Sequence, residues 1–483
     1  MGNLFKLVVV VAIGFAVYGV FKAEPEGINV EGNVFNVPAS NISFYEDLTY
    51  VDENEVRFSE QEIFDQVFKM IRGANNYILM DMFLFNEFLG TDVGSYRQLS
   101  DELTEELIAK KNAVPDIDIV LITDPINTLY GGYESPHFKE LEEAGVEVVV
   151  TNLKELRDSN PIVSGFWRAY FSWFGNSTRE GYLTNPFDAR LPDIGIRSYA
   201  TLLNFKANHR KIVIADKTTA SGIKLSTLVT SANPHDGSSA HTNTALVIDD
   251  FVWKDVLASE VAVADFSKAA ITVPGEELLG RINDTEGNVS VQLLTEERIR
   301  ERLVESIKML RDEDTLDIAM FYLSDRKVIQ AIKDASNIGV VIRVLLDPNK
   351  DAFGREKNGI PNRSVAFELA EHNGKIKIRW CHTHGEQCHT KMVIIKSKEG
   401  HSLLLGSANL TRRNIGGYNL ESNIYIESAG LFGALTGAKE YFEKVWENEP
   451  GKIYSTDYSV YLDKSYKNSL LYRLMEDLGT SSF

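Results

Sequence analysis

Two long stretches of the chain repeat one pattern of apolar and polar positions. In the first, apolar residues recur at helical spacing over residues 63–71, and a nearly continuous apolar run follows at 77–85. In the second, helical spacing over 299–310 precedes an apolar run at 316–323. A spacing of three and four predicts amphipathic helices, whereas short apolar runs predict buried strands. The pattern indicates an internal duplication.

The same order continues in both stretches, because each has a second apolar run, an Asp-Pro pair, a helical segment and a third apolar run. These segments are 117–122, Asp124-Pro125 and 146–150 in the first copy, and 340–346, Asp347-Pro348 and 376–378 in the second. Strands that alternate with helices predict an α/β fold with sheets flanked by helices. We therefore expect two mixed, mostly parallel sheets, related by a pseudo-twofold axis in one bilobed domain.

Each copy then reaches a strand with a His and a Lys two positions apart at its head. These are Asn208–Asp216, with His209 and Lys211, and Cys388–Lys396, with His389 and Lys391. Residues i and i+2 of a strand point to the same side, so imidazole and ammonium point together. A small polar stretch follows each strand, Thr230-Ser231-Ala232-Asn233 and Gly406-Ser407-Ala408-Asn409. One such unit is a weak signal, but two in the same internal order are a strong one.

The pattern His-x-Lys-x4-Asp followed by Gly-Ser-x-Asn resembles the signature of the phospholipase D superfamily, over roughly residues 55–450. The first copy has His209, Lys211 and Asp216, whereas the second has Lys396 where the family usually has Asp. The stretch from Asn208 to Ile212 also resembles the corresponding strand of cardiolipin-synthase-like members. The resemblance implies a bilobed fold in which the two His-Lys strands meet at the seam.

Cleavage of a phosphodiester requires groups that screen its charge, a nucleophile and a proton donor for the leaving oxygen. Lysine and amide donors can stabilise the charge, while one imidazole attacks to form a phosphohistidine and the other protonates the alcohol. No metal or other cofactor is needed for this reaction. The resemblance implies these roles for six residues: His209, Lys211, Asn233, His389, Lys391 and Asn409.

We expect His209 to be the nucleophile and His389 the acid. Glu421 resembles the family carboxylate that orients a His, and Asp216 is expected to be a structural or supporting residue. The first copy has no evident Glu after Asn233, so Asn243 or His241 is a candidate substitute. The supporting residues predicted around the site are Asp216, Ser231, Ser407 and Glu421.

An almost unbroken apolar run at residues 7–21 predicts a membrane helix near the N-terminus. A cleaved signal peptide is the alternative, but no good small-x-small cleavage site follows. We therefore expect a single-pass anchor. Lys6 precedes the span and acidic residues follow Lys22, which favours a cytoplasmic N-terminus and an extracytoplasmic catalytic domain.

The repeat divides the chain into an anchor (1–27), a first lobe (28–250), a connector (251–290), a second lobe (291–450) and a tail (451–483). The two lobes differ by an insertion at about residues 155–200. Its segment 161–174 is dense in Trp, Tyr and Phe. Such a segment is typical either of a membrane interface or acyl-chain wall, or of a helix buried on the lobe.

The composition narrows the classes of partner. A net charge of −19 argues against a dedicated DNA-binding protein, because binding to the nucleic acid backbone needs a basic surface. The two cysteines, Cys381 and Cys388, either pair across a short loop or remain two buried thiols. With His382 and His384 they suggest zinc, but the repeat explains His389 better, and we expect no metal.

These features favour a phospholipid substrate in a membrane, with water or an alcohol as the acceptor, over nucleic acid. The expected activity is phosphatidyl hydrolysis or transfer, as in phospholipases D and cardiolipin synthases. One alternative is a membrane-tethered nuclease with a basic groove that begins at Lys206, Arg210, Arg412 and Arg413. The other is a non-catalytic lipid-binding relative, which Lys396 and the incomplete first copy keep open.

Overall fold

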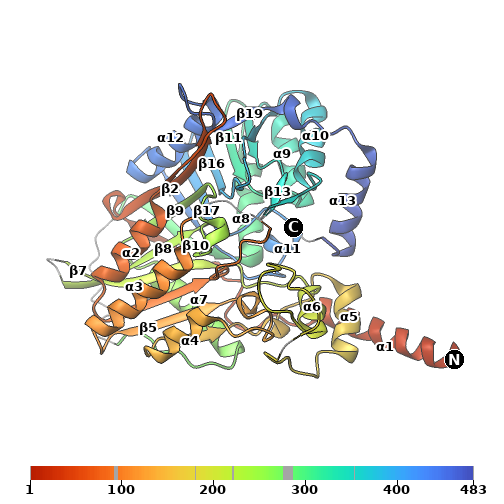
Figure 1. The fold of residues 1–483 in the computed structure, drawn as a ribbon. Coiled ribbons are helices and arrows are strands. Elements are labelled where there is room, and N and C mark those ends of the chain that lie inside the picture. The colour runs from red at the N-terminus through yellow and green to blue at the C-terminus, as the bar shows by residue number, and fades with distance from the viewer. Residues whose placement is uncertain are drawn as a thin grey trace.

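The computed structural model describes residues 2–91, 96–179, 181–219, 222–275, 287–352 and 354–481. Two sheets form the centre of the molecule, and helices lie on their outer faces (Figure 1). The first sheet has the order β3 (Arg57–Gln61), β2 (Ile42–Val51), β9 (Asn243–Ile248), β8 (Gly222–Thr230), β7 (Lys211–Thr219), β4 (Tyr77–Met82), β5 (Asp118–Thr123) and β6 (Glu147–Val150).

The second sheet has the same inner arrangement with additional edge strands. Its order is β1 (Phe35–Val37), β10 (Val289–Thr295), β18 (Ser422–Ser428), β17 (Gly400–Gly406), β16 (Lys391–Ser397), β11 (Thr315–Met320), β12 (Val341–Leu346), β15 (Lys377–Cys381) and β19 (Ser455–Asp457). The order β9-β8-β7-β4-β5-β6 matches β18-β17-β16-β11-β12-β15 strand for strand. The duplicated α/β fold with two mixed sheets is therefore confirmed.

The expectation that the sheets are mostly parallel is wrong. Among the strands that the structure describes, only β4–β5–β6 and β11–β12–β15 pair in parallel. The strands β7, β8 and β9, and likewise β16, β17 and β18, are antiparallel neighbours. Parallel pairing needs a long crossover, whereas a short turn suffices for an antiparallel hairpin. In each copy the long helical crossovers come before the His-Lys strand. The strands that follow it are joined by shorter connections and pair antiparallel.

The helices divide between the two copies, and α5 and α6 belong to the insertion that the second copy lacks. The first copy has α2 (Ile63–Gly73), α3 (Leu99–Ala113), α4 (Pro136–Glu143), α5 (Pro161–Tyr170), α6 (Ile196–Leu202) and α7 (Trp253–Phe266). The second has α8 (Glu296–Met309), α9 (Arg326–Asn337), α10 (Asn362–Asn373), α11 (Arg412–Ile415), α12 (Gly433–Glu447) and α13 (Tyr466–Leu478). Apolar side chains of α2, α3 and α4 form one core with β4, and those of α8, α9 and α10 form another with β11.

The largest core lies between the copies. It joins the inner faces of both sheets, for example Ile212 and Leu246 from the first and Met392 and Ile424 from the second, with residues of α7 and α12. Burial of this apolar surface holds the two copies together as one unit. The predicted connector contains α7, and its residues 276–286 lie outside the described part of the chain.

The N-terminal helix α1 (Gly2–Phe21) projects from the body of the molecule and packs against α5 of the insertion (Figure 1). It is long and apolar enough to cross a membrane, a property that membrane anchors and signal sequences share. Gly165 of α5 lies against Ala12 and Ala16, so the two backbones approach closely at small residues. The hydroxyl of Tyr170 also donates to the carbonyl of Val8, at 2.8 Å.

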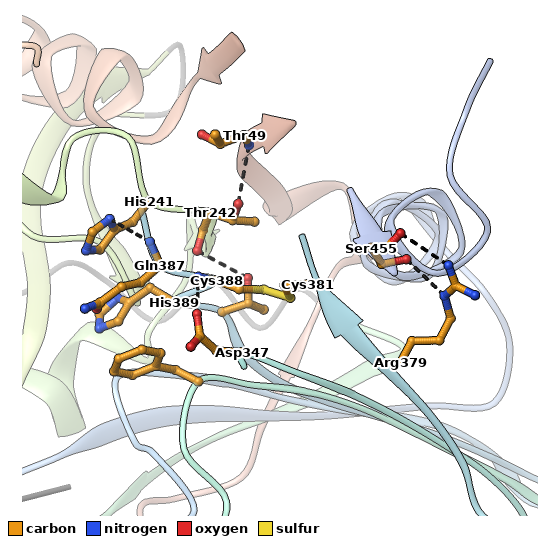
Figure 2. The surroundings of a disulfide bond; sticks show 12 residues. Thr49, His241, Thr242, Asp347, Arg379, Cys381, Gln387, Cys388, His389 and Ser455 are labelled. Atoms are coloured by element: carbon orange, nitrogen blue, oxygen red, sulfur yellow. Dashed lines mark hydrogen bonds between the residues drawn. A yellow bond between two sulfur atoms is a disulfide. The ribbon is translucent and has the colours of Figure 1, made fainter. Parts of the chain in front are cut away.

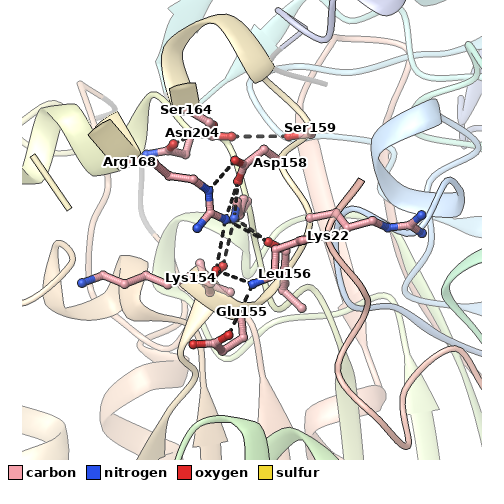
Figure 3. Close-up of polar contacts among 12 residues, drawn as sticks. Lys22, Lys154, Glu155, Leu156, Asp158, Ser159, Ser164, Arg168 and Asn204 are labelled. Atoms are coloured by element: carbon pink, nitrogen blue, oxygen red, sulfur yellow. Dashed lines mark hydrogen bonds and ion pairs between the residues drawn. The ribbon is translucent and has the colours of Figure 1, made fainter. Parts of the chain in front are cut away.

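A buried ion cluster lies where the insertion meets this helix. The carboxylate of Asp158 lies 2.6 Å from Arg168 and 2.5 Å from Lys206, while its backbone N–H donates to the carbonyl of Gly19 (Figure 3). Burial acts to raise the pKa of Asp158, but the two cations outweigh it and lower the pKa. Through Asp158 the insertion thus binds both α1 and the segment that precedes β7.

Asp216, on β7, is bound to the turn before β4. Its carboxylate accepts backbone hydrogen bonds from Asn75, Asn76 and Tyr77, at 2.8–3.0 Å. In the second copy Lys396 is exposed at the matching place, and the corresponding turn is closed by Asp314, which accepts from the backbone N–H of Arg311 at 2.8 Å. In the second copy, Asp314 within the turn itself thus takes the place of the Asp that is missing from the His-Lys strand.

Asp216→Ala is expected to lower the free energy of unfolding by about 2–3 kcal/mol, because three backbone N–H groups, that of the buried Tyr77 among them, lose a charged acceptor. The measurement is urea denaturation followed by circular dichroism. Lys396→Ala is the matched control from the second copy and should unfold like the parent protein. Equal stabilities for the parent and Asp216→Ala would contradict this role.

Candidate active site

Two pairs of backbone hydrogen bonds join the His-Lys segments across the seam. His209 donates to the carbonyl of Leu420 at 2.9 Å, and Leu420 donates back to Ala207 at 3.0 Å. On the other side His389 donates to Thr242 at 2.9 Å, and Thr242 donates to Gln387 at 3.1 Å (Figure 2 shows these residues). Each site histidine is therefore held by a strand bridge to the opposite copy.

The Asp of each Asp-Pro pair supports the residue before each histidine. Asp124 accepts the backbone N–H of Asn208 at 2.7 Å, and Asp347 accepts that of Cys388 at 2.8 Å. Sequence reasoning used these pairs only to align the repeat. The Asp of each pair occupies the same place in the repeat before its histidine. This recurrence could have indicated that both Asp residues support the site.

The ring of His209 is oriented by Glu421 from the other copy. Nδ1 of His209 lies 3.0 Å from the carboxylate of Glu421. The hydroxyl of Ser407 and the amide of Asn414 donate to the same carboxylate. A carboxylate partner at Nδ1 fixes the proton there and leaves Nε2 with its lone pair.

The ring of His389 is oriented in the same way by Asn243 from the first copy. Nδ1 of His389 lies 3.1 Å from Oδ1 of Asn243, which also accepts the hydroxyl of Ser231 at 3.0 Å. Ser231 and Ser407 thus take matching places in the two copies. Of the two candidate substitutes for the missing Glu, Asn243 makes this contact, while the ring of His241 lies 5.7 Å from that of His389.

The two lysines and two phenylalanines complete the symmetric arrangement. Nζ of Lys211 donates to the carbonyl of His209, and Nζ of Lys391 donates to that of His389, both at 2.7 Å. Each ammonium also lies over a phenyl ring, Phe83 at 5.0 Å and Phe321 at 5.2 Å. The same phenyl rings contact the two histidine rings. Sequence reasoning missed both phenylalanines, which occupy matching places at the ends of the first strands of the two copies.

One cavity of about 280 Å³ receives both histidines. His209, His389, Asn233 and Asn409 all line it, and Oδ1 of Asn409 is buried without a hydrogen-bond partner among the described residues. Four of the six predicted site residues thus line a single space, and Lys211 and Lys391 each bind the backbone carbonyl of one of its histidines. A compact tetrahedral anion could contact both copies at once in this space.

Residues 303–446 match the family described as cardiolipin synthase, PLD-like domain. This segment, which holds His389, Lys391 and Asn409, is thus similar to a phospholipase D-like domain. Comparison with curated proteins gave no match.

A solved structure of low sequence identity shows the same fold. The phosphatidylserine synthase of Haemophilus influenzae Rd KW20 is 12% identical, with a TM-score of 0.57, and the alignment covers 94% of this chain and 96% of that one. Nuc of Salmonella typhimurium, a phospholipase D family member, is 17% identical over 35% of this chain and 99% of its own, with a TM-score of 0.27. The first of these likenesses covers both copies of the duplicated fold.

Burial shifts the titration of the site groups. It lowers the pKa of His209 to about 4, against the opposing effect of Glu421, and with Lys391 and His241 it holds the pKa of His389 well below its usual value. It also lowers the pKa of Lys211 to about 7. Burial opposes ionisation of Glu421, but the nearby His209 and Lys211 lower the pKa of that carboxyl. Both imidazoles are therefore neutral at pH 7.

Some predicted residues lie elsewhere. The hydrogen bonds of Asp216 go to the turn before β4, so its role is structural. Arg210, counted as part of a basic groove, is fully buried between Glu260 and Glu296, at 2.9 and 2.8 Å. Lys206, also counted there, is paired with Asp158, although it still lines the cavity.

Cys381 and Cys388 form a disulfide, so they are not the two free thiols of the alternative interpretation (Figure 2). The bond closes the loop directly before His389. Neither cysteine can therefore serve as a thiolate ligand for zinc. Among the described residues, the group that could hold a metal ion is Glu55, His382 and His384, which includes none of the predicted site residues.

Asn243→Asp is expected to raise the pKa of His389 by about 1–2 pH units, because a negative charge beside Nδ1 favours the imidazolium. Histidine NMR titration in detergent would measure this, with the signal assigned by comparison with His389→Gln. Asn337→Asp, which adds the same charge at the exposed end of α9, should leave that pKa unchanged. An unshifted His389 titration in Asn243→Asp would contradict the contact.

Proposed function

We propose that the protein is a phosphatidyl-hydrolysing or phosphatidyl-transferring enzyme that acts at a membrane through a phosphohistidine. The observation that carries this proposal is the pair of histidines in one cavity, each oriented at Nδ1 by the opposite copy. Both rings then present Nε2, the atom that attack or proton donation requires.

In the first step, Nε2 of His209 attacks phosphorus and the bond to the leaving alcohol breaks. The alcohol oxygen takes the proton from Nε2 of His389, and the phosphatidyl group remains on His209. Glu421 favours His209 as the nucleophile, because its carboxylate stabilises the positive charge of the phosphorylated ring. Lys211, Lys391, Asn233 and Asn409 are proposed to stabilise the phosphoryl oxygens.

In the second step, His389 takes a proton from water or an alcohol, whose oxygen attacks phosphorus while the P–N bond breaks. The acid must be protonated before the first step, although burial lowers the pKa of His389. The negative phosphodiester acts in the opposite direction, since an adjacent anion raises a histidine pKa. Substrate binding thus supplies the charge that makes His389 an acid.

An apolar cavity beside the site supports a lipid substrate. It has a volume of about 460 Å³, is lined by aromatic residues that include Tyr130, Trp167 and Phe171, and shares Tyr130 and Lys206 with the histidine cavity. Phe166, Trp173 and Phe174 of the same insertion are exposed. Aromatic residues of this kind suit the boundary between lipid and water. We propose that this cavity receives an acyl chain while the phosphate lies between the histidines.

The charge distribution gives less support to a nuclease. Lys206 and Arg210 are engaged by buried carboxylates, so they are not free to bind phosphates along a nucleic acid strand. The net charge of −19 also opposes approach of a polyanion. A non-catalytic role is disfavoured because both oriented histidines are present.

The N-terminal helix and the disulfide support an extracytoplasmic enzyme. We propose that α1 remains as an anchor, because α5 packs on it at Ala12 and Ala16 and Asp158 binds the carbonyl of Gly19. A disulfide persists in oxidising compartments. Both features support the proposal that the catalytic domain lies on the side of the membrane opposite to the cytoplasm.

The full-length protein in detergent is expected to release headgroup from phosphatidylglycerol or phosphatidylcholine vesicles, or to form a new phosphatidyl alcohol when glycerol or ethanol is added. His209→Ala and His389→Ala should each reduce this turnover on the order of 10⁴-fold. Single-stranded DNA is tested in parallel. The measurement is product formation by mass spectrometry.

The alternatives give different results in the same assay. Cleavage of DNA without lipid turnover would support a nuclease, and lipid binding without turnover, intact in both variants, would support a non-catalytic relative. His372→Ala, on the exposed end of α10, is the control and should retain full activity. A phosphatidyl adduct recovered on His209 of the parent protein during turnover would assign the nucleophile.

Ala200→Phe is expected to raise the KM for long-chain phospholipids by about tenfold, which corresponds to about 1.4 kcal/mol of lost binding. Ala200 lines the apolar cavity, so the added ring takes the space of the acyl chain. A short-chain phospholipid should keep its KM within about twofold, because it does not fill the cavity. Ala109→Phe, on the exposed face of α3, is the matched control, and equal losses for both chain lengths would exclude an acyl site.

A further inference from the structure

A second cluster of ligating side chains lies across the seam between the two copies, apart from the histidine cavity. His382 and His384 come from the loop that the Cys381–Cys388 disulfide closes, and Glu55 comes from the turn between β2 and β3. One candidate ligand atom from each residue lies within 4.8 Å of the others. Two segments of the chain, the turn between β2 and β3 and the disulfide-closed loop, therefore supply all three candidate ligands.

The geometry within the cluster is compact. Nε2 of His384 lies 2.6 Å and Nε2 of His382 lies 3.9 Å from the same oxygen of Glu55. The two imidazole rings are 4.5 Å apart and nearly perpendicular. Donor atoms that share a tetrahedral zinc ion at about 2.0–2.1 Å are themselves a little over 3 Å apart, and these separations lie on either side of that value.

Internal hydrogen bonding leaves part of the cluster unsatisfied. Nδ1 of His382 and Nδ1 of His384 are both buried, and neither has a hydrogen-bond partner among the described residues. A buried polar atom without a partner carries a desolvation penalty. The contacts with Glu55 run through Nε2 of both rings, so Nε2 is the atom of each imidazole that faces the carboxylate, and the unpartnered Nδ1 atoms are not metal ligands in this arrangement.

The surrounding residues hold the loop in place. The backbone N–H of His384 donates to Glu386 at 2.9 Å, and Arg57 donates to the carbonyl of His384 at 3.3 Å. Lys350 donates to the carbonyl of Thr383 at 3.1 Å. The two nearby cations are offset by acids, since Arg57 lies 3.5 Å from Glu386 and Lys350 lies 3.6 Å from Asp351. The local charge does not oppose a divalent cation.

We propose that Glu55, His382 and His384 bind one borderline divalent transition-metal ion of the zinc type. Two imidazoles and one carboxylate are ligands that zinc takes in proteins, whereas magnesium and calcium prefer an all-oxygen set. Glu55 is largely exposed, so a water molecule can occupy the remaining position. The ion takes no part in the phosphohistidine reaction.

The metal would act as a cross-link between the copies. Glu55 belongs to the first sheet, whereas His382 and His384 belong to the loop that runs into Cys388 and His389. An ion bound to both binds the folded protein and not the unfolded chain, so it stabilises the closed seam. This consequence is independent of whether the substrate is a phospholipid.

The test uses the full-length protein in detergent, with its disulfide intact, its purification tag removed and its metal stripped with a chelator. Added ZnCl₂ is expected to bind at one equivalent per chain by calorimetry and elemental analysis. It should raise the Tm by about 3–5 °C at saturation. Glu55→Gln, His382→Ala and His384→Ala should each lose both effects.

His401→Ala is the matched control, because this partly exposed histidine lies on β17 and outside the cluster. It should bind zinc like the parent protein. Tm values measured without metal show whether each variant folds, and Glu55→Gln keeps a hydrogen-bond acceptor for His384. Zinc uptake that persists unchanged in the three variants, no uptake by the parent protein, or an equal Tm rise with MgCl₂ would each overturn the proposal.

Discussion

The hydrogen bond from Nδ1 of His209 to Glu421 joins a strand of one copy to a strand of the other, and its counterpart from His389 to Asn243 does the same in reverse. Neither copy can orient its own histidine. The backbone bridges at Leu420 and Thr242 bring the partners within reach, and the apolar core between the sheets holds those bridges in register. Assembly of the site and packing of the two copies are therefore one event.

The two halves of this arrangement are alike in shape and different in charge. Ser231 and Ser407 occupy matching places, as do Lys211 and Lys391, but a carboxylate faces His209 and an amide faces His389. A carboxylate stabilises a positively charged ring more strongly than an amide does. The two histidines of the duplicated fold therefore have different hydrogen-bond partners. Such a difference suits a reaction in which one histidine is the nucleophile and the other the acid.

The insertion links this site to the N-terminal helix. Asp158 binds Arg168 and Lys206 together, and its own backbone holds the end of α1 (Figure 3). Burial lowers the pKa of Lys206 to about 7, against the opposing effect of Asp158, so the ion pair depends on tight packing. Because Lys206 lines both cavities, the position of α1 and the shape of the proposed lipid path depend on one buried cluster.

Local patterns were sufficient for much of this description. Hydrophobic periodicity revealed the duplication and the principal helices and strands, and the spacing of His209 and Lys211, repeated at His389 and Lys391, identified the residues that the structure gathers around one cavity. These features could be predicted because helical and strand periods, and the two-residue spacing of a strand, are properties of neighbouring residues.

Only the tertiary structure decided which residues face each other across the seam. The pairing of Asn243 with His389, the antiparallel pairing of the later strands, the structural role of Asp216 and the burial of Arg210 all depend on contacts between segments far apart in the chain. The cluster of Glu55 with His382 and His384 has the same origin. The sequence by itself determined which His, Lys and Asn side chains each copy contributes. The packing of one copy against the other decided their partners, because hydrogen bonds and ion pairs form between neighbours in space.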